Sequence, residues 1–354
     1  MKYIGLDAHK TIIVASVISD KGKNVKTMSV EASVSGLEKI HQYLNGKKYC
    51  VIMESSTYAY LPYRFFDDLG IETHMIHAQS FKVITDTDRK TDLLDSDKLG
   101  KYLRLWKRKE IELSMSFVPT RQQCELKDLC RQREHVSDVM SDEARRIGSH
   151  LARNIMDVPE EFSNLRTKKS RNYLREKFGS DETLMSILRH YEHLFYEAEK
   201  LTDSIESKMP NDFNVKLLAE IPGIGRQTAV QLMSMIVDIN RFDTSEKISA
   251  YFGLVPRVRD SGGKENHGRM TKKGDSMMRS ILERCVLSHM RFCDSSVKDF
   301  YNRKKSEIGT KKALVASARK LLVIIFTILK QQRSFTLYPP AHLSDKLSAA
   351  DAAA

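Results

Sequence analysis

The sequence predicts an α/β domain over residues 1–118 followed by mainly α-helical sequence, and two patterns support this fold class. Up to residue 118, short runs rich in β-branched residues alternate with amphipathic stretches of helix length, as in a domain of packed strands and helices. Beyond that point the sequence consists of long charged stretches in which apolar residues recur at helical spacing. Its 354 residues, 41% hydrophobic and 29% charged, suffice for two or three globular domains.

The elements of the first domain follow from their residue patterns. Residues 2–17 alternate between apolar and polar types. They precede a DKGK turn and the segment VKTMSV, which predicts an opening strand pair. The later elements are expected in the order helix SGLEKIHQYL, strand YCVIMES, helix YLPYRFFDDLG and strand ETHMIHA. A helix at 90–106, KTDLLDSDKLGKYLRLW, completes the domain.

Three further regions are expected after this domain. Residues 119–209 should form a coiled-coil region, an antiparallel helical pair that acts as a spacer or an oligomerisation arm. Residues 210–335 should form a mainly α C-terminal domain, interrupted by PGIG, by a glycine-containing basic stretch and by a KKGD turn. Residues 336–354 form a tail that contains proline and lies outside the fold prediction.

The distribution of charge indicates a polyanionic partner. The formal net charge is +12, and the stretch from Arg257 to Lys320 carries 17 basic and 7 acidic residues, so it holds +10 of that total. Nucleic acid is the leading explanation for so concentrated a positive charge. The apolar run LLVIIFTIL is too short to span a bilayer, and the five cysteines lack CxxC or zinc-like spacing, which predicts reduced thiols in a cytoplasmic protein.

Two aspartates lie on the apolar side of the helix expected at 90–106. At 100° per residue, Asp92 and Asp95 fall within the same sector of about 80° as Leu99 and Leu103. Asp97 falls on the opposite face, which is expected to be exposed to solvent and to carry pairs of opposite charges. Buried carboxylates repel each other unless protons or cations neutralise them. The helix therefore predicts a metal site at the first two aspartates and not at Asp97.

Two more carboxylates occur on strands. Asp7 lies on the first strand and Glu54 ends the strand CVIME. Hard oxygen ligands suit Mg²⁺ or Mn²⁺, and a pair of such ions can stabilise the attacking and leaving oxygens of phosphoryl transfer. Each acid taken alone could instead be a cap or a surface residue. We call the complete set the four acids: Asp7, Glu54, Asp92 and Asp95.

The segment EIPGIGRQTAVQL predicts a helix-hairpin-helix element. Backbone amides around Gly223 and Gly225 could contact a phosphate without reading sequence. The alternative is a simple turn between two helices.

A second basic segment contains a serine. Ser261 precedes two glycines in a stretch expected to be a loop. Such a serine could attack phosphorus if its hydroxyl is activated, whereas the alternative is a basic loop in which the serine only hydrogen-bonds to nucleic acid. Six cationic residues flank it and could clamp phosphates. They are Arg257, Arg259, Lys264, Arg269, Lys272 and Lys273.

Three aromatic or imidazole side chains lie near the acids in sequence. His9 shares a strand face with Asp7 by period two and could touch a metal or a phosphate, but local packing or hydrogen bonding is the favoured interpretation, and we assign it no role. Tyr58 and Tyr60 follow Glu54 and could stack on bases, although packing in the core is the expectation that we favour.

Taken in order along nearly the whole chain, these motifs resemble the DEDD-type transposases of the insertion sequence 110 family, a group that includes the Piv-type DNA invertases. The resemblance rests on GLDAHK, MESSTY, KTDLLDSDKL and LAEIPGIGRQTA, on RFDTSEKISAYFGLVPRVRDSGGKENHGRMTKKGD, and on KKALVASARKLL. Two positions depart from the family pattern, Ser96 where alanine is usual and Ser56 where glycine is frequent.

The resemblance implies an RNase H-like (RuvC-like) N-terminal domain whose acidic tetrad corresponds to the four acids and binds Mg²⁺. It also implies a C-terminal transposase domain in which Ser261 is the nucleophile that holds DNA as a covalent phosphoserine. It further implies a structured non-coding guide RNA, donor and target DNA as substrates, and a tetramer with composite sites from different subunits. A bacterial or archaeal cell with a nucleoid is the implied setting.

Two rival functions remain at this point. One is a RuvC-like nuclease or junction resolvase, in which metal-bound water attacks and Ser261 has no catalytic part. The other is a protein that binds nucleic acid without chemistry, against which the complete set of four acids argues.

Overall fold

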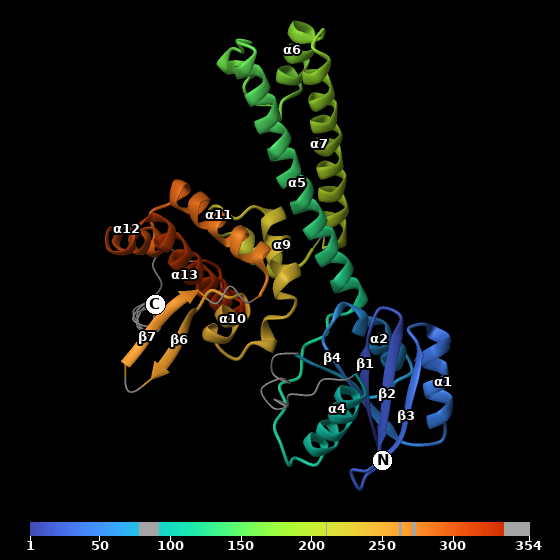
Figure 1. The fold of residues 1–354 in the computed structure, drawn as a ribbon. Coiled ribbons are helices and arrows are strands. Elements are labelled where there is room, and N and C mark those ends of the chain that lie inside the picture. Colours follow the sequence, from blue (N-terminus) through green and yellow to red (C-terminus); the bar gives the residue numbers. More distant parts are fainter. Residues whose placement is uncertain (78–91, 210, 262–263, 271–273, 336–354) are drawn as a thin grey trace. The chain divides into compact units, whose positions relative to one another are not determined.

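The chain forms two compact units, residues 1–118 and 119–354 (Figure 1). The structure, a computed structural model, describes the backbone of residues 1–77, 92–209, 211–261, 264–270 and 274–335. Side chains are described over the same residues except 92–94, 256–261 and 264–270. In the described residues no helix is long and apolar enough to cross a membrane.

Unit 1 (residues 1–118) is built on a mixed five-stranded sheet of order β3-β2-β1-β4-β5. Strands β1, β2 and β3 are antiparallel neighbours, while β4 is parallel to both β1 and β5. Its elements are β1 (Lys2–Ala8), β2 (Ile12–Ile18), β3 (Asn24–Glu31), α1 (Val34–Leu44), β4 (Tyr49–Glu54), η1 (Thr57–Ala59), α2 (Tyr60–Asp68), β5 (Thr73–Ile76) and α4 (Asp92–Lys107).

The opening of the chain differs from the expected strand pair. Residues 2–17 contain two strands, β1 and most of β2, so three strands open the unit. The His9 amide donates to the Ile12 carbonyl at 2.9 Å and closes a tight connection between the two strands. Three consecutive polar and exposed residues, His9, Lys10 and Thr11, form this turn and interrupt the alternation, and the prediction of one strand over residues 2–17 overlooked that break.

The two faces of the sheet are covered by different helices. One face packs Ile4, Leu6 and Met53 against α1 and α2, and Phe66 of α2 is fully buried in this core. The other face packs Tyr3, Cys50 and Ile52 against Leu99 and Leu103 of α4. Because successive strand residues point to opposite faces, every second residue of β1 and β4 faces α4.

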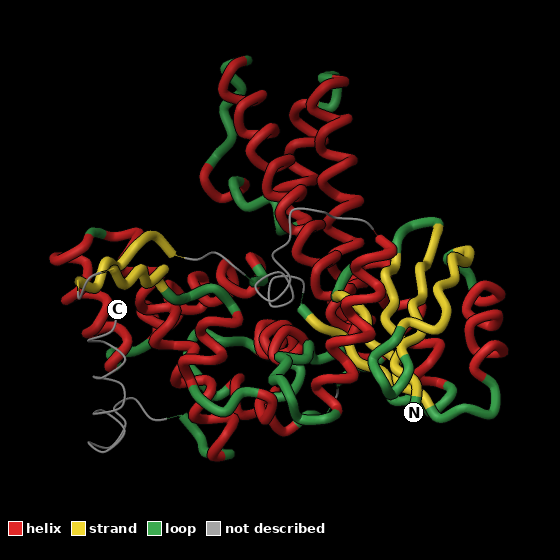
Figure 2. The backbone as a smooth tube through the Cα atoms, turned by 60° about the horizontal axis from the view of Figure 1, so that its bottom comes forward, coloured by secondary structure: helices red, strands yellow, loops and turns green. Residues whose placement is uncertain are grey.

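Unit 2 (residues 119–354) is almost entirely helical in its described part, with one two-stranded sheet (Figure 2). A capping box between Thr120 and Gln123 begins the long helix α5. Its elements are α5 (Arg121–Arg153), η2 (Glu160–Phe162), α6 (Lys168–Phe178), α7 (Glu182–Lys208), α8 (Phe213–Ala219), α9 (Arg226–Ile236), η3 (Ile239–Arg241), α10 (Ser245–Tyr251), β6 (Pro256–Ser261), β7 (Lys264–Met270), α11 (Ser276–Phe292), α12 (Ser296–Ile308) and α13 (Thr310–Gln331).

Helices α5 and α7 form the antiparallel pair expected for the coiled-coil region, with α6 at one end (Figure 1). Their seam contains Val136, Ala198 and Leu201, and nearer α6 it contains Met140 and Leu188. The helices from α8 to α13 surround a separate and larger core that also takes in Leu126 and Cys130 of α5. None of the five cysteines forms a disulfide.

Candidate functional site

Asp7 and Glu54 lie at neighbouring positions on the same edge of the sheet. Strands β1 and β4 are parallel, and Leu6 is paired with Met53, so the two acids are the next residues on adjacent strands. Both belong to the alternate positions that face α4, since Tyr3 and Ile52 of the same series pack against that helix. The sheet therefore brings two of the four acids together on the α4 side.

Helix α4 lies unusually close to β1, and two glycines allow this. A Cβ atom on Gly5 would be 2.0 Å from the Ser96 carbonyl oxygen and 2.5 Å from the Gly100 amide nitrogen, distances that no side chain can adopt. A Cβ atom on Gly100 would in turn lie 3.3 Å from the Tyr3 carbonyl oxygen. Helix α4 thus runs opposite to β1, and its N-terminal turn extends from Gly5 toward the edge that carries Asp7.

Asp95 precedes the contact residue Ser96, and Asp92 is the first residue of α4. The structure therefore places the backbone of both aspartates on the helix that packs across the face of Asp7 and Glu54. The side chain of Asp92 lies outside the described residues. Within the described side chains, no group of three or more His, Cys, Asp or Glu residues is close enough to hold a metal ion, so the predicted four-acid metal site stays a prediction.

Asp97 lies apart from this arrangement, as its helical phase predicts. It accepts a hydrogen bond from Asn24 Nδ2 at 2.8 Å and forms an ion pair with Lys101 Nζ at 2.6 Å. The pairing with Lys101 is the i,i+4 contact expected on the charged face of a helix. This confirms the assignment of Asp97 to the charge-paired face.

His9 contacts an acid directly. Its Nε2 lies 3.2 Å from Oδ2 of Asp7, and its side chain is 47% exposed. This is the local hydrogen bond favoured from the sequence. The contact also puts an imidazole at the rim of the acidic edge.

Ser261 lies in unit 2, at the end of a strand and not in the loop expected from its glycines. It is the last residue of β6 and pairs with Lys264, the first residue of β7, while Arg259 pairs with Asn266. The side chains of β6 and β7 lie outside the described residues, and so do Lys272 and Lys273. A serine at the tip of a two-stranded ribbon with basic residues on both strands remains compatible with either interpretation made from the sequence.

The PGIG segment joins α8 to α9, as the helix-hairpin-helix pattern predicts. Gly223 has φ +88°, and a Cβ there would be 2.5 Å from the backbone nitrogen of His289 on α11. Gly225 is the N-cap of α9, is exposed, and has no atom within 4 Å of an added Cβ. Gly223 therefore serves packing inside unit 2, and Gly225 presents the open part of the hairpin.

His289 holds this hairpin, a role that the sequence analysis did not find. It is fully buried, and its Nδ1 donates to the Pro222 carbonyl at 2.7 Å. Its Nε2 lies 2.7 Å from the Ser295 hydroxyl, which also caps α12. Burial lowers the pKa of His289, and the neutral imidazole accepts from Ser295 at Nε2. No local signal in the sequence marks such a contact.

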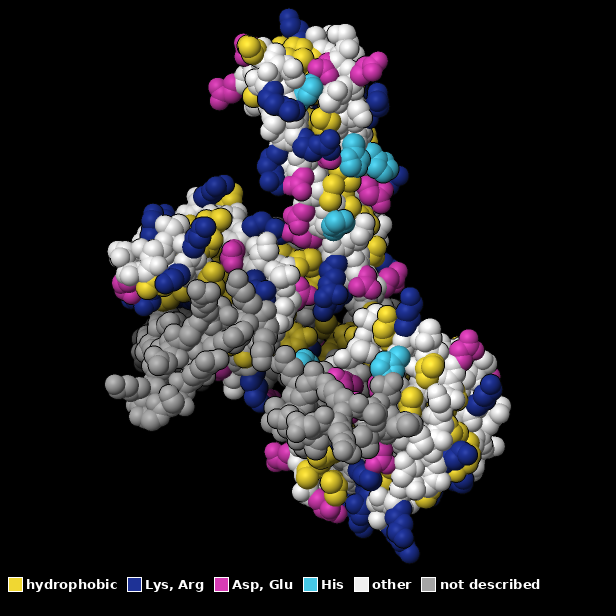
Figure 3. Space-filling view, viewed as in Figure 1, with side chains coloured by type: hydrophobic (Ala, Val, Ile, Leu, Met, Phe, Trp, Pro, Cys, Tyr) yellow, Lys and Arg dark blue, Asp and Glu magenta, His cyan; other side chains and the backbone are white. Residues whose placement is uncertain are grey.

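The described part of the basic stretch forms an exposed surface on unit 2. Lys and Arg side chains are distributed over α11 and α12 (Figure 3, dark blue). The exposed cations near the turn from α12 to α13 are Arg303, Lys305, Lys311 and Lys312. Such a surface attracts the phosphates of nucleic acid without reading sequence.

Comparison with protein families agrees with this combination of an α/β unit that carries the four acids and a basic helical unit. Residues 4–155 match a DEDD-type IS110 transposase model. Residues 215–302 match a model described as the IS116/IS110/IS902 transposase family. The chain belongs to this transposase family. The first match contains the four acids, and the second contains both PGIG and Ser261, so each candidate site falls in a separate family domain.

Relatives of this transposase include enzymes that move or invert DNA. The transposase for insertion sequence element IS1111A of Coxiella burnetii is 25% identical over 95% of this chain and 91% of its own length. The transposase for insertion sequence element IS1328 of Yersinia enterocolitica is 26% identical over 43% of this chain and 47% of its own. The pilin gene-inverting protein of Moraxella lacunata is 31% identical over 35% of this chain and 39% of its own. Membership in the family identifies the chain as a DNA transposase or recombinase, and DNA as its partner.

Proposed function

We propose that this transposase is a Mg²⁺-dependent DNA recombinase that cuts and rejoins DNA through Ser261 and is guided by a non-coding RNA. The observation that carries the proposal is the placement of Asp7 and Glu54 at adjacent strand ends, facing the helix that begins at Asp92 and bears Asp95. Four carboxylates on three neighbouring elements are the donor set expected for Mg²⁺, and Mn²⁺ is an acceptable substitute.

The topology of unit 1 supports an RNase H-like fold for this domain. In the order β3-β2-β1-β4-β5, an antiparallel meander is extended by two parallel strands. The parallel strands β1 and β4 end at one edge, and that is where Asp7 and Glu54 lie. Chemistry at the carboxyl ends of parallel strands is common in α/β proteins.

In this proposal the four acids hold the metal and orient the phosphate for attack. The ion, when bound, supplies positive charge to the phosphate oxygens and favours deprotonation of the attacking hydroxyl. Asp7 and Glu54 supply fixed ligands from the sheet, while Asp92 and Asp95 supply ligands from a helix held at close contact by Gly5. His9, at 3.2 Å from Asp7, orients that carboxylate.

Ser261 would perform the covalent step. Its hydroxyl loses a proton, its Oγ forms a bond to phosphorus, and the bond from phosphorus to one bridging oxygen of the strand breaks. That oxygen takes up a proton and leaves as a free hydroxyl. Attack by the hydroxyl of another strand on the phosphoserine reverses these changes and rejoins the DNA, so that no external energy source is consumed.

The guide RNA and the tetramer are carried over from the family resemblance. Ser261 and the four acids belong to different units of the chain. A tetramer with composite sites would supply the acidic domain from one subunit and the serine from another. Basic residues on α12 and α13 and on the β6–β7 ribbon would hold DNA or RNA phosphates.

Inversion of a DNA segment is a second candidate outcome of the same chemistry. The Moraxella lacunata relative is named as a pilin gene-inverting protein. Inversion and transposition require the same cleavage and rejoining steps and differ in the arrangement of the two DNA sites. A plasmid with two sites in opposite orientation would reveal inversion as a change of restriction pattern.

The decisive experiment is a denaturing gel of the purified protein with Mg²⁺, labelled DNA from the ends of its element and RNA from the element's non-coding flank. We expect a protein–DNA adduct that survives denaturant, disappears with Ser261→Ala and fails to form with Asp7→Asn or with a chelator. Cleavage without an adduct, equal in Ser261→Ala, would instead establish a nuclease in which water attacks. Binding without any cleavage under all conditions would contradict both enzymatic functions.

A further inference from the structure

The segment that follows Glu54 exposes two aromatic rings, contrary to the core packing favoured from the sequence. Tyr58 is 47% exposed and Tyr60 is 40% exposed, although each is close in sequence to fully buried residues. Leu61, directly after them, is 40% exposed as well. Large apolar side chains that remain in solvent beside a candidate site are often held there for a partner.

The backbone that carries these rings is fixed at both ends. Ser55 donates its amide hydrogen to the Ile76 carbonyl of β5 at 2.8 Å, which continues the sheet by one bond beyond Glu54. Ala59, between the two tyrosines, is fully buried in the core with Phe66 of α2. The two rings therefore project from a short and anchored segment, so that little conformational entropy is lost when a flat partner packs on them.

The position of the segment limits what the partner can be. Tyr58 is four residues beyond Glu54, so its Cα lies within about 14 Å of the Glu54 Cα. Bases along one strand of B-DNA are about 3.4 Å apart. A strand whose phosphate lies at the four acids would therefore place bases within reach of both rings.

We propose that Tyr58 and Tyr60 form a stacking platform for unpaired bases of the DNA strand that is cut at the four acids. This inference rests on the proposed function of the acidic edge. Aromatic rings stack on any base, since every base has a π-face, and so the platform would favour unpaired DNA without selecting a sequence. It would stabilise a locally opened duplex at the point of cleavage.

The hydroxyl groups of the same segment fit this partner. Ser56 and Thr57 are exposed beside the rings, and neutral hydroxyls donate hydrogen bonds to phosphate oxygens. Neutral donors suit this position because the neighbouring acids repel phosphates wherever no cation compensates them. The Tyr58 hydroxyl adds a further donor at the edge of the platform.

A binding experiment with matched variants tests the platform. The full-length protein carries Asp7→Asn so that no strand is cut, and two labelled probes are compared in Mg²⁺ buffer: a fully paired duplex and the same duplex with a central bubble of unpaired thymines. Tyr58→Ala and Tyr60→Ala should each weaken binding of the bubble by about 5-fold or more, with a smaller change for the paired duplex. Tyr58→Phe and Tyr60→Phe keep the ring and should retain the preference.

Tyr43→Ala is the control. Tyr43 is similarly exposed, at 38%, but it lies in the last turn of α1, which leads into the start of β4, the end of that strand away from Glu54. It should leave both affinities unchanged, and thermal unfolding of each variant verifies that it is folded. Equal affinity of the alanine variants and their parent for the bubble would overturn the proposal, as would an equal loss with Tyr43→Ala.

The outcome can be separated from that of the proposed function. Cleavage by the protein with an intact Asp7, tested on element DNA, reports on the acids and Ser261 independently of the stacking assay. If cleavage occurs and the alanine variants bind the bubble normally, only the platform is wrong. If the bubble preference depends on the tyrosines but no cleavage is found, the platform stands as a binding site and the proposed chemistry is wrong.

Discussion

Ser16 on β2 and Ser96 on α4 share a buried hydrogen bond of 2.8 Å between their hydroxyl oxygens. Both residues are fully buried, and Gly5, the β1 neighbour of Ser16, contacts the backbone of Ser96. The bond therefore fixes the helical turn that follows Asp95 to the middle of the sheet.

We expect the two serines to be energetically coupled. Ser96→Ala should lower the free energy of unfolding of unit 1 by about 1 kcal/mol, since it removes the bond and leaves the buried Ser16 hydroxyl with only a weaker contact to Thr27 at 3.3 Å. The double variant Ser16→Ala/Ser96→Ala should lose less than the sum of the two single changes, because no buried hydroxyl is left unpaired. Urea unfolding of the four proteins gives this double-mutant cycle, and simple additivity would contradict the coupling.

Gly5→Ala should displace α4 from the sheet. The added methyl would lie 2.0 Å from the Ser96 carbonyl oxygen, so helix or strand must move, at a cost of about 3 kcal/mol or more. Gly148→Ala is the control, since nothing lies within 4 Å of its added Cβ on α5, and it should stabilise that helix by about 0.5 kcal/mol or more. Both the midpoint temperature of thermal unfolding and the rate of DNA cleavage should fall for Gly5→Ala. A stable and active Gly5→Ala variant would show that the close contact is dispensable.

The two glycines of the PGIG hairpin should respond differently to substitution. Gly223→Ala places a methyl 2.5 Å from the His289 backbone at a φ of +88°, and it should destabilise unit 2 by several kcal/mol. Gly225→Ala meets no atom within 4 Å, and its φ is −77°, so the protein should fold normally. Comparison of their unfolding midpoints checks this. Any loss of DNA affinity in a folded Gly225→Ala variant would then report on the exposed part of the hairpin.

His289 should make the stability of unit 2 fall in mild acid. Because burial lowers its pKa, the unfolded chain binds a proton at this residue at a higher pH than the folded protein does. The stabilisation is therefore complete above about pH 6.5 and decreases as the pH falls below that value. His289→Gln should be less stable at pH 7.5 but should lose less stability between pH 7.5 and 5.5 than the parent protein. Parallel urea titrations measure both slopes, and identical slopes would exclude His289 as the responsible group.

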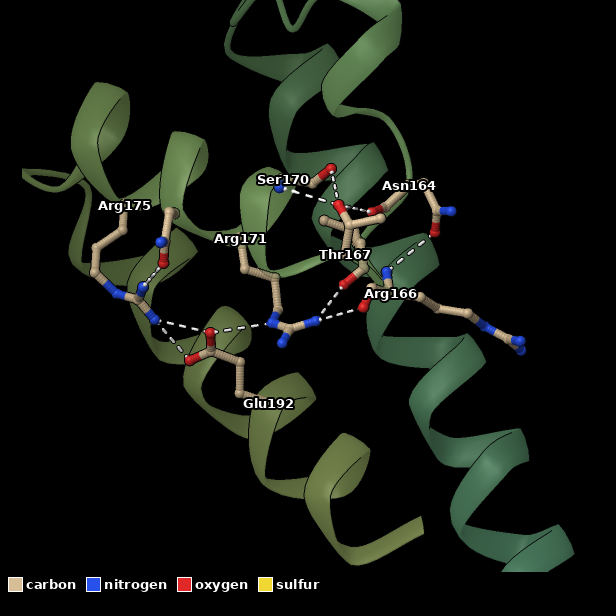
Figure 4. Close-up of polar contacts among 9 residues, drawn as sticks. Asn164, Arg166, Thr167, Ser170, Arg171, Arg175 and Glu192 are labelled. Atoms are coloured by element: carbon tan, nitrogen blue, oxygen red, sulfur yellow. Dashed lines mark hydrogen bonds and ion pairs between the residues drawn. The ribbon is translucent and has the colours of Figure 1, made fainter. Parts of the chain in front are cut away.

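Replacing Glu192 should destabilise the end of the α5–α7 pair more than replacing its exposed partner Arg175. Arg171 is only 3% exposed, donates to the Leu165 and Arg166 carbonyls, and has its Nε 3.3 Å from Glu192, which also binds Arg175 (Figure 4). Glu192→Ala leaves the buried guanidinium without its carboxylate and should cost about 3 kcal/mol. Arg175→Ala removes an ion pair whose cation is 48% exposed and should cost less than about 1 kcal/mol. Hydrogen exchange of α6 amides should rise far more in the first variant, and equal protection in both would contradict the assignment.

Sequence periodicity correctly predicted the features that depend on a single strand or helix. Period two placed Asp7 and His9 on one strand face, and the two are in contact. Helical phase separated Asp97, which pairs with Lys101, from the apolar stripe of Leu99 and Leu103. These results require only the geometry of one strand or one helix.

Three expectations were wrong. The opening strand pair is three strands, because the polar residues His9 to Thr11 form a turn that a hydrogen bond from the His9 amide to the Ile12 carbonyl closes. Ser261 ends a strand, because its ribbon is formed by pairing with β7, which no property of the glycines predicts. Tyr58 and Tyr60 are exposed because the buried position of this segment is taken by Ala59.

The sequence by itself determined the division into an α/β part and a helical part, the positions of the four acids on strands and helix, and the concentration of positive charge in the C-terminal domain. Tertiary structure alone decided how close α4 approaches β1, which hydroxyl Ser96 meets 80 residues away, and that His289 closes the PGIG hairpin. The physical reason is that periodicity records which face of an element is apolar. Contacts between distant segments depend instead on how those faces pack. The absence of a Cβ atom at Gly5 or Gly223 sets how closely two such segments approach.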